Sequence, residues 1–186
     1  MAIPPADCAP ADDTCCVWLY RIADHLLTET FNALLACYHD SSCKDQIAAY
    51  VTMGAADDGV NDALTVAIRD IIPSTRNGPG TIALFQANFE VRLRESGWPT
   101  IAEGPNDTIL FPSSEQFAHA AAWTFARGEA MHAKLSSMMS KRQLTPSGFP
   151  CMNASIGTMV PLRPSGGVVG WTIPVAVNFT SFPAAS

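Results

Sequence analysis

The C-terminal part of the chain alternates between large apolar residues and small or neutral ones with a period of two. From Val169 to Phe179 every odd position is large and apolar, whereas the even positions carry Gly, Thr, Pro, Ala and Asn. This alternation predicts a β-strand with one face in a core. The other face of such a strand usually carries charge, yet Arg163 is the only charged residue between Gln143 and the C-terminus. Because an uncovered strand of this kind promotes aggregation, we expect another chain, or the protein's own helices, to cover it.

A second strand is predicted just before this one, over residues 153–162. The two are joined by the turn Arg163-Pro164-Ser165-Gly166-Gly167, so the pair predicts a C-terminal hairpin. Pro174 lies within the second strand and has no backbone N–H to donate. It therefore indicates a sheet edge or a bulge at that position.

The strand predicted over residues 85–94 has the charged face that the C-terminal strand lacks. Its apolar positions are Phe85, Ala87, Phe89, Val91 and Leu93, and its polar positions are Gln86, Asn88, Glu90, Arg92 and Arg94. Two shorter strands are expected upstream, one at the start of the segment IAAYVTMGAADDG (47–59) that runs into its Asp-Asp-Gly turn, and one over residues 64–69 that ends before Pro73. The segment STRNGPG (74–80) and the segment GPNDT (104–108) are predicted to be loops.

Two segments show helical periodicity. The first runs from about Cys15 to Tyr38 after the N-cap candidates Asp12, Asp13 and Thr14. Its apolar stripe is formed by Leu19, Ala23, Leu26, Leu27, Thr30, Leu34 and Tyr38. The second begins at the capping box in PSSEQ (112–116), ends at TPSGFP (145–150), and has a stripe formed by Phe117, Ala121, Thr124, Gly128, Met131, Leu135 and Met138.

Together these elements predict one α+β domain over residues 1–186. We expect an antiparallel or mixed sheet, two main helices packed on one face, and the C-terminal hairpin. Residues 1–13 are expected to form an N-terminal arm and residues 180–186 a C-terminal tail.

The composition excludes some classes of function. Only 15% of the residues are charged, and the formal net charge is −6, so binding of nucleic acid through its phosphates is not expected. An acidic wall still allows DNA to slide past without sticking. No apolar run is long enough to span a bilayer, and the N-terminus lacks the features of a secretory signal. We therefore expect the cytoplasm or an assembled particle as the location.

No catalytic or cofactor motif is present, and we expect neither an enzyme nor a bound cofactor or metal. The four histidines lack zinc-protease spacing, and Asp57, Asp58 and Asp62 lack the ligand pattern of a calcium loop. Glu90 and Glu95 are five residues apart in a strand, hence on opposite faces, which argues against a catalytic carboxylate pair.

The six cysteines leave three interpretations open. They are Cys8, Cys15, Cys16, Cys37, Cys43 and Cys151. Plain reduced thiols suit a chain without a secretory signal. A disulfide between the 8–16 and 37–43 regions is the second interpretation, and a metal site at Cys37, His39 and Cys43 is the third, although its spacing is irregular for zinc.

Four segments, in this order, resemble the tail terminator (head–tail joining) proteins of long-tailed bacteriophages, especially those of actinobacterial siphophages. The segment AYVTMGAADDGVNDALTVAIRDIIPS (49–74) resembles the family's first strand pair with its Gly-to-Asp turn, and NFEVRLRESGWPTI (88–101) resembles its charged strand with a Pro-Thr break. The segment PSSEQFAHAAAWTFARGEAMHAKL (112–135) resembles the family's second helix, and PSGGVVGWTIPVAV (164–177) resembles its closing hairpin. The resemblance covers most of the chain, from Cys15 to Phe179.

The resemblance implies a structural virion protein that acts by geometry rather than catalysis. Such proteins form a homo-hexameric ring at the head-proximal end of the tail tube, end tube polymerisation and join the tail to the head. The implied partners are further copies of the chain, the tail tube protein and a head-completion or neck protein, with DNA passing through the lumen and no membrane contact. The implied location is the virion tail or neck, and the host cytoplasm during assembly. The expected interface residues are Arg163, Pro164, Gly166, Gly167, Thr172, Ala176, Arg76 and Asn77.

Other functions remain open at the level of sequence. One is another ring-forming component of the same particle, such as a tail tube or head-completion subunit, although a tube protein is expected to be nearly all β. Another is an α+β domain that binds a small molecule or is an enzyme, which requires a pocket with convergent polar groups. A membrane-inserting hairpin fits least, since aromatic girdles are absent.

Overall fold

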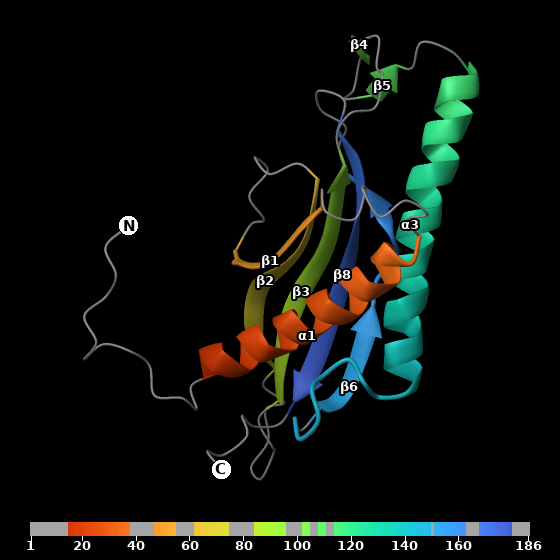
Figure 1. Cartoon of the computed structure of the whole chain (residues 1–186). Helices are drawn as coiled ribbons and strands as arrows, with labels where there is room; N and C mark the ends of the chain where they lie inside the picture. Colours follow the sequence, from red (N-terminus) through yellow and green to blue (C-terminus); the bar gives the residue numbers. More distant parts are fainter. Residues whose placement is uncertain are drawn as a thin grey trace.

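The computed structural model describes residues 15–37, 47–54, 62–74, 84–95, 102–104, 108–110, 114–149, 151–162 and 168–179. The elements are α1 (Cys15–Leu35), β1 (Ala48–Met53), β2 (Ala63–Ser74), β3 (Leu84–Glu95), β4 (Ala102–Gly104), β5 (Thr108–Leu110), α3 (Ser114–Ser140), β6 (Cys151–Ile156), β7 (Val160–Pro161) and β8 (Val169–Phe179). In Figure 1, α1 crosses the sheet and α3 runs along the side of β6 and β8. The α+β fold class predicted from the sequence is confirmed.

The main sheet has six strands in the order β1-β2-β3-β8-β6, with β7 pairing with β8 beyond the end of β6. β1 and β2 are parallel, and every other neighbouring pair in this sheet is antiparallel. The sheet is therefore mixed, with β1 and β6 as its outermost long strands. A separate two-stranded sheet pairs β4 with β5 across the segment predicted to be only a loop.

One hydrophobic core lies between the helices and one face of the sheet. β2, β3 and β8 contribute alternate buried residues, among them Val66, Phe89 and Val175, as the period-two pattern predicts. We call the other face of the sheet the helix-free face, because no described helix packs on it. It is lined by the even-numbered positions of β3 and β8.

The apolar stripe of α1 is confirmed along its described length. Its predicted members from Leu19 to Leu34 are buried, and Ile22, which the stripe did not include, is buried with them. Thr30 is tolerated in this core because its hydroxyl donates to the backbone oxygen of Leu26 at 2.6 Å. The helix ends at Leu35, three residues before the predicted end at Tyr38, which lies outside the described residues.

The stripe of α3 is confirmed where side chains are described: Gly128, Met131, Leu135 and Met138 are buried. Gly128 is needed for close approach, because a Cβ there would collide with the Met159 sulfur and lie 3.0 Å from the Trp171 ring. The helix ends at Ser140, before the predicted TPSGFP stop.

A Schellman motif ends α3 there. Arg142 takes the left-handed conformation with φ 56°, which glycine usually supplies. The amide of Gln143 then donates to Met138 O at 2.7 Å, and the amide of Arg142 donates to Met139 O at 3.0 Å. This sharp ending turns the chain toward β6.

Three strand predictions differ from the structure. β2 continues through Pro73, where β3 is the only described strand that pairs with it, because β1 pairs with Ala63–Ile68 alone. Residues 63–68 are buried on both faces rather than one, since Thr65 and Ala67 are small and lie between the longer side chains of β1 and β3. The first hairpin strand is split into β6 and β7.

Candidate subunit interface

β8, the strand without charged residues, lies inside the sheet. β3 pairs with it along its whole length, and β6 and β7 pair with its other side. The chain's own strands therefore cover the backbone of β8. Only its helix-free face is left to contact something else.

Pro174 lies opposite the gap between β6 and β7, inside the sheet, and its pairing with Glu90 of β3 shows no register shift, so it marks neither an edge strand nor a bulge in the β3–β8 pair. Its carbonyl accepts a hydrogen bond from the Gly157 amide at 2.8 Å, so its missing N–H faces this same gap. No ladder bond is lost, because β6 ends at Ile156 and β7 begins at Val160.

The helix-free face carries an ion cluster centred on Glu90 of β3. Arg92 donates to the Glu90 carboxylate at 2.7 Å, Arg69 of β2 lies 3.4 Å from it, and the Thr172 hydroxyl of β8 donates to it at 2.7 Å. Asn88 beside it donates to Asp70. The charged face of β3 thus supplies a hydrogen-bond partner to the uncharged face of β8. This contact cannot be predicted without knowing that β3 and β8 are neighbours in the sheet.

Glu90 titrates below its ordinary range in the fold. Burial acts to raise its pKa, but the hydrogen bonds from Arg92 and Thr172 and the charges of Arg92 and Arg69 outweigh burial and lower the pKa. The ionised carboxylate is therefore favoured in the folded state. Its stabilisation is present above the pKa of an unfolded glutamate and is lost as the pH falls through the lowered pKa.

We expect Glu90→Gln to lower the free energy of unfolding by about 1 kcal/mol at neutral pH, because it removes a charge that two arginines approach. The difference should vanish at a pH below the lowered pKa of Glu90, where the native side chain is neutral too. Urea unfolding at a series of pH values measures it, with Glu129→Gln on the exposed side of α3 as the control. A difference that stays constant with pH would contradict the ionic role.

The interface residues expected from the sequence fall into two groups. Thr172 and Ala176 are half-buried on the helix-free face, and Thr172 is bonded to Glu90. The other six lie outside the described residues: Arg163, Pro164, Gly166, Gly167, Arg76 and Asn77. Their place in an interface stays a prediction.

The two edge strands of the sheet lack charged residues, a feature that was not predicted from the sequence. β1 has the sequence AAYVTM and β6 the sequence CMNASI, so neither has a charged residue. The charges of the sheet lie instead on β2 and β3, in its middle. Soluble proteins usually protect sheet edges with charge, proline or a covering element. Both outer strands of this sheet are therefore suited to pair with another strand.

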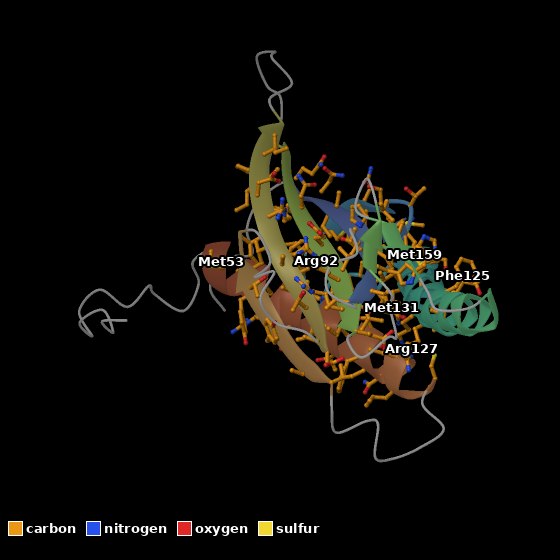
Figure 2. The ribbon with its side chains drawn as sticks, turned by 90° about the horizontal axis from the view of Figure 1, so that it is seen from above. Met53, Arg92, Phe125, Arg127, Met131 and Met159 are labelled. Atoms are coloured by element: carbon orange, nitrogen blue, oxygen red, sulfur yellow. The ribbon has the colours of Figure 1, made fainter. Side chains whose placement is uncertain are left out.

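Exposed apolar side chains lie on the two opposite flanks of the molecule. Met53, at the end of β1, is 74% exposed. Phe125 of α3 and Val160 of β7 are 47% and 45% exposed on the other flank, where Met159 is partly buried. Figure 2 shows Met53 on one side of the sheet, and Phe125 and Met159 on the far side beside α3. A hollow of about 700 Å³ between the alanine-rich side of α3 and Met159 lies on this second flank.

A groove of about 680 Å³ lies where β6 begins. Its walls are formed by His25, Glu29, Met138, Met139, residues 142–149, Cys151, Asn153 and Ala154. Two polar side chains in these walls have partners within the chain: the His25 Nε2–H donates to Gln143 O at 2.8 Å, and Lys134 lies 2.6 Å from Glu29. The lysine's hydrogen bond and charge lower the pKa of Glu29 despite burial.

A buried ion pair joins α3 to the end of β3. The guanidinium of Arg127 contacts the Glu95 carboxylate, and the two residues are only 4% and 6% exposed. Glu95 and Glu90 lie on opposite faces, as predicted, and each is paired with arginine. Cys37 lies close by: burial raises the pKa of its thiol, the charge of Arg127 acts to lower it and that of Glu95 to raise it. The pair fixes α3 against the sheet.

Within the described residues there is no cluster of three or more metal-ligating side chains. Cys37 and Cys151 are unbridged, and the side chains of the other four cysteines are outside the described part. None of the described helices is long and apolar enough to cross a membrane.

No known family model matches this chain, and no curated protein matches it either. A proposal about its function therefore depends on its own residues and on the sequence resemblance.

Proposed function

We propose that the chain is a structural virion protein, a tail terminator that forms a ring at the head-proximal end of a phage tail tube. In this role it ends tube polymerisation and joins the tail to the neck, in the virion and, during assembly, in the host cytoplasm. Its partners are further copies of itself, the tail tube protein and a head-completion protein.

One observation carries this proposal: two uncharged edge strands lie on opposite sides of the same sheet. β1 runs with β2, and each step from β2 to β3, β8 and β6 reverses direction, so β1 and β6 run in opposite directions. A neighbour related by rotation about an axis parallel to the strands would turn its β6–β7 edge toward β1 in the antiparallel direction, with Met53 level with Ile156 at the end of β6. Such head-to-tail contacts use two different surfaces, and they close into a ring when the rotation divides a full turn evenly.

Two further features support a tail terminator among ring-forming proteins. The helices α1 and α3 cover one sheet face, whereas a tail tube subunit is expected to be nearly all β. The net charge of −6 suits a ring through which DNA passes without binding. The number of subunits, six, is what the resemblance implies.

The test is native mass measurement and negative-stain imaging of the purified protein, alone and mixed with the tail tube protein of the same phage. We expect a closed ring of one defined mass, and tubes that stop growing when it is added. Tube protein without this chain is the control for length. A chain that stays monomeric at every concentration and leaves tube length unchanged would overturn the proposal, whereas a ring that does not stop tubes points to another neck component.

A further inference from the structure

The strand registers determine which part of the opposite edge lies level with β1. From the last residue of β1, the paired residues across the sheet are Met53, Ile68, Phe89, Val175 and Ile156. Met53 therefore lies at the height of the end of β6. Rotation about an axis parallel to the strands preserves this height, so the same levels hold between neighbouring subunits of the proposed ring.

The start of β1 lies level with β7. The corresponding path from Ala49 passes through Leu64, Leu93 and Trp171 to Pro161, the last residue of β7. Residues 49–53 therefore span the same height as residues 156–161, which include the end of β6, the gap and β7. A neighbour's β1 is long enough to run along this whole stretch.

Val51 and Met53 point to the helix side of the sheet. They are paired in register with Val66 and Ile68, whose buried side chains belong to the core under the helices. Paired residues on adjacent strands share a face, so both β1 side chains lie on the helix side.

The hollow on the opposite flank opens at the same height and on the same side. Its walls include the alanine-rich side of α3, at Ala126, Ala130 and Ala133, and Thr158 and Met159 of the gap. Met159 lies against α3, because a Cβ at Gly128 would collide with its sulfur. The hollow therefore lies between α3 and the gap, on the helix side of the sheet.

We propose that Val51 and Met53 of each subunit cover the hollow between α3 and Met159 of the next subunit. This inference rests on the self-assembly part of the proposed function and names its contact. The occupant of the hollow is thus a second copy of this chain.

The two surfaces are complementary in chemistry. Met53 is the most exposed of the large apolar side chains described, and β1 has no charged residue. Methionine adapts its shape to an irregular cavity, and the exposed small side chains of Ala126 and Ala133 leave room for it. Phe125 of α3 exposes further apolar surface on the same flank (Figure 2). The contact removes apolar surface of both copies from water, which favours association.

The first experiment compares Met53→Asp with Ile72→Asp by sedimentation over a concentration series. Both replace an exposed apolar strand residue with the same charge, but Ile72 of β2 is paired with Gln86, beyond the height of β1. We expect Met53→Asp to stay folded and to raise the concentration for half assembly by roughly tenfold or more, as at a buried interface anchor. We expect Ile72→Asp and Met53→Leu to assemble like the native protein. Assembly of Met53→Asp at the native concentration would overturn the inference.

The reciprocal change in the hollow is Ala133→Lys. It places a long charged side chain in the hollow, while a lysine four residues after Glu129 supports the helix. We expect the same loss of assembly with an unchanged circular dichroism spectrum. Ser140→Lys, at the exposed end of α3 and outside the hollow, is the matched control and should assemble like the native protein. Native-like assembly of Ala133→Lys would contradict the inference.

The third experiment identifies the contact directly. A photo-reactive benzophenone side chain at position 53, in a minority of isotopically light subunits within rings of heavy native protein, should cross-link to residues 156–159 or 126–133 of the heavy chain. A cross-link to β1 of the heavy chain, or to residues 138–154 alone, would overturn the contact while leaving the ring proposal intact. A native chain that never assembles would overturn the proposed function itself, which is a different outcome.

Discussion

Replacing Arg127 with alanine is expected to lower the free energy of unfolding by about 3–5 kcal/mol, because Glu95 would keep a charge in a site from which water is excluded. Both residues are almost fully buried, at the junction of α3 and the end of β3. An exposed ion pair would contribute only about 0–1 kcal/mol. Urea unfolding followed by circular dichroism, at a concentration where the chain is monomeric, measures the difference.

The control for this prediction is the double variant Arg127→Met with Glu95→Leu. It removes both charges together and keeps much of the volume, so it should recover most of the loss, since apolar replacements of buried ion pairs are often neutral. An Arg127→Ala variant that loses less than about 1 kcal/mol would show that solvent reaches this pair.

Replacing Phe179 with alanine should lower the free energy of unfolding by about 3–5 kcal/mol, because a fully buried ring is removed and the cavity refills only in part. Its ring lies 5.7 Å from Phe85 of β3 and 5.5 Å from Phe149, and Phe149 lies 5.5 Å from Trp18 of α1. Through these four aromatic side chains, α1 and the end of β8 pack against β3 and against the wall of the groove. Thermal unfolding by calorimetry measures the loss.

Phe179→Leu is the matched control, since it keeps most of the apolar volume and should cost less than about 1.5 kcal/mol. Equal stability of the alanine and leucine variants would contradict a closely packed aromatic cluster.

Local pattern accounts for most of the secondary structure. The strand over residues 84–95, the buried stripe of α1 and the stripe of α3 from Gly128 to Met138 all follow from periodicity, because burial on one face of a helix or strand imposes it. The strand predictions were wrong where the extent of a strand depends on which other strands pair with it. β2 passes through Pro73 because β1 has already ended, and β6 and β7 are separate because Pro174 lies opposite the gap between them.

The candidate interface was less predictable. An uncharged strand is visible in the sequence, but the strand order is not, since it depends on pairing between residues far apart along the chain. The sequence pointed to the C-terminal strand as the surface in need of a neighbour. In the structure that strand is flanked on both sides, and Glu90 bonds Thr172 on its helix-free face. Within the described residues the sheet ends instead at β1 and β6, whose short uncharged sequences did not stand out.

The sequence by itself determined the α+β class, the helices on one sheet face, and the near absence of charge after Gln143. These properties depend on local periodicity and composition, which any fold of the chain must respect. Only the tertiary structure decided which strands end the sheet, that Glu95 and Arg127 meet, and that Met53 lies level with the end of β6. These properties depend on contacts between distant segments, and no local pattern encodes them.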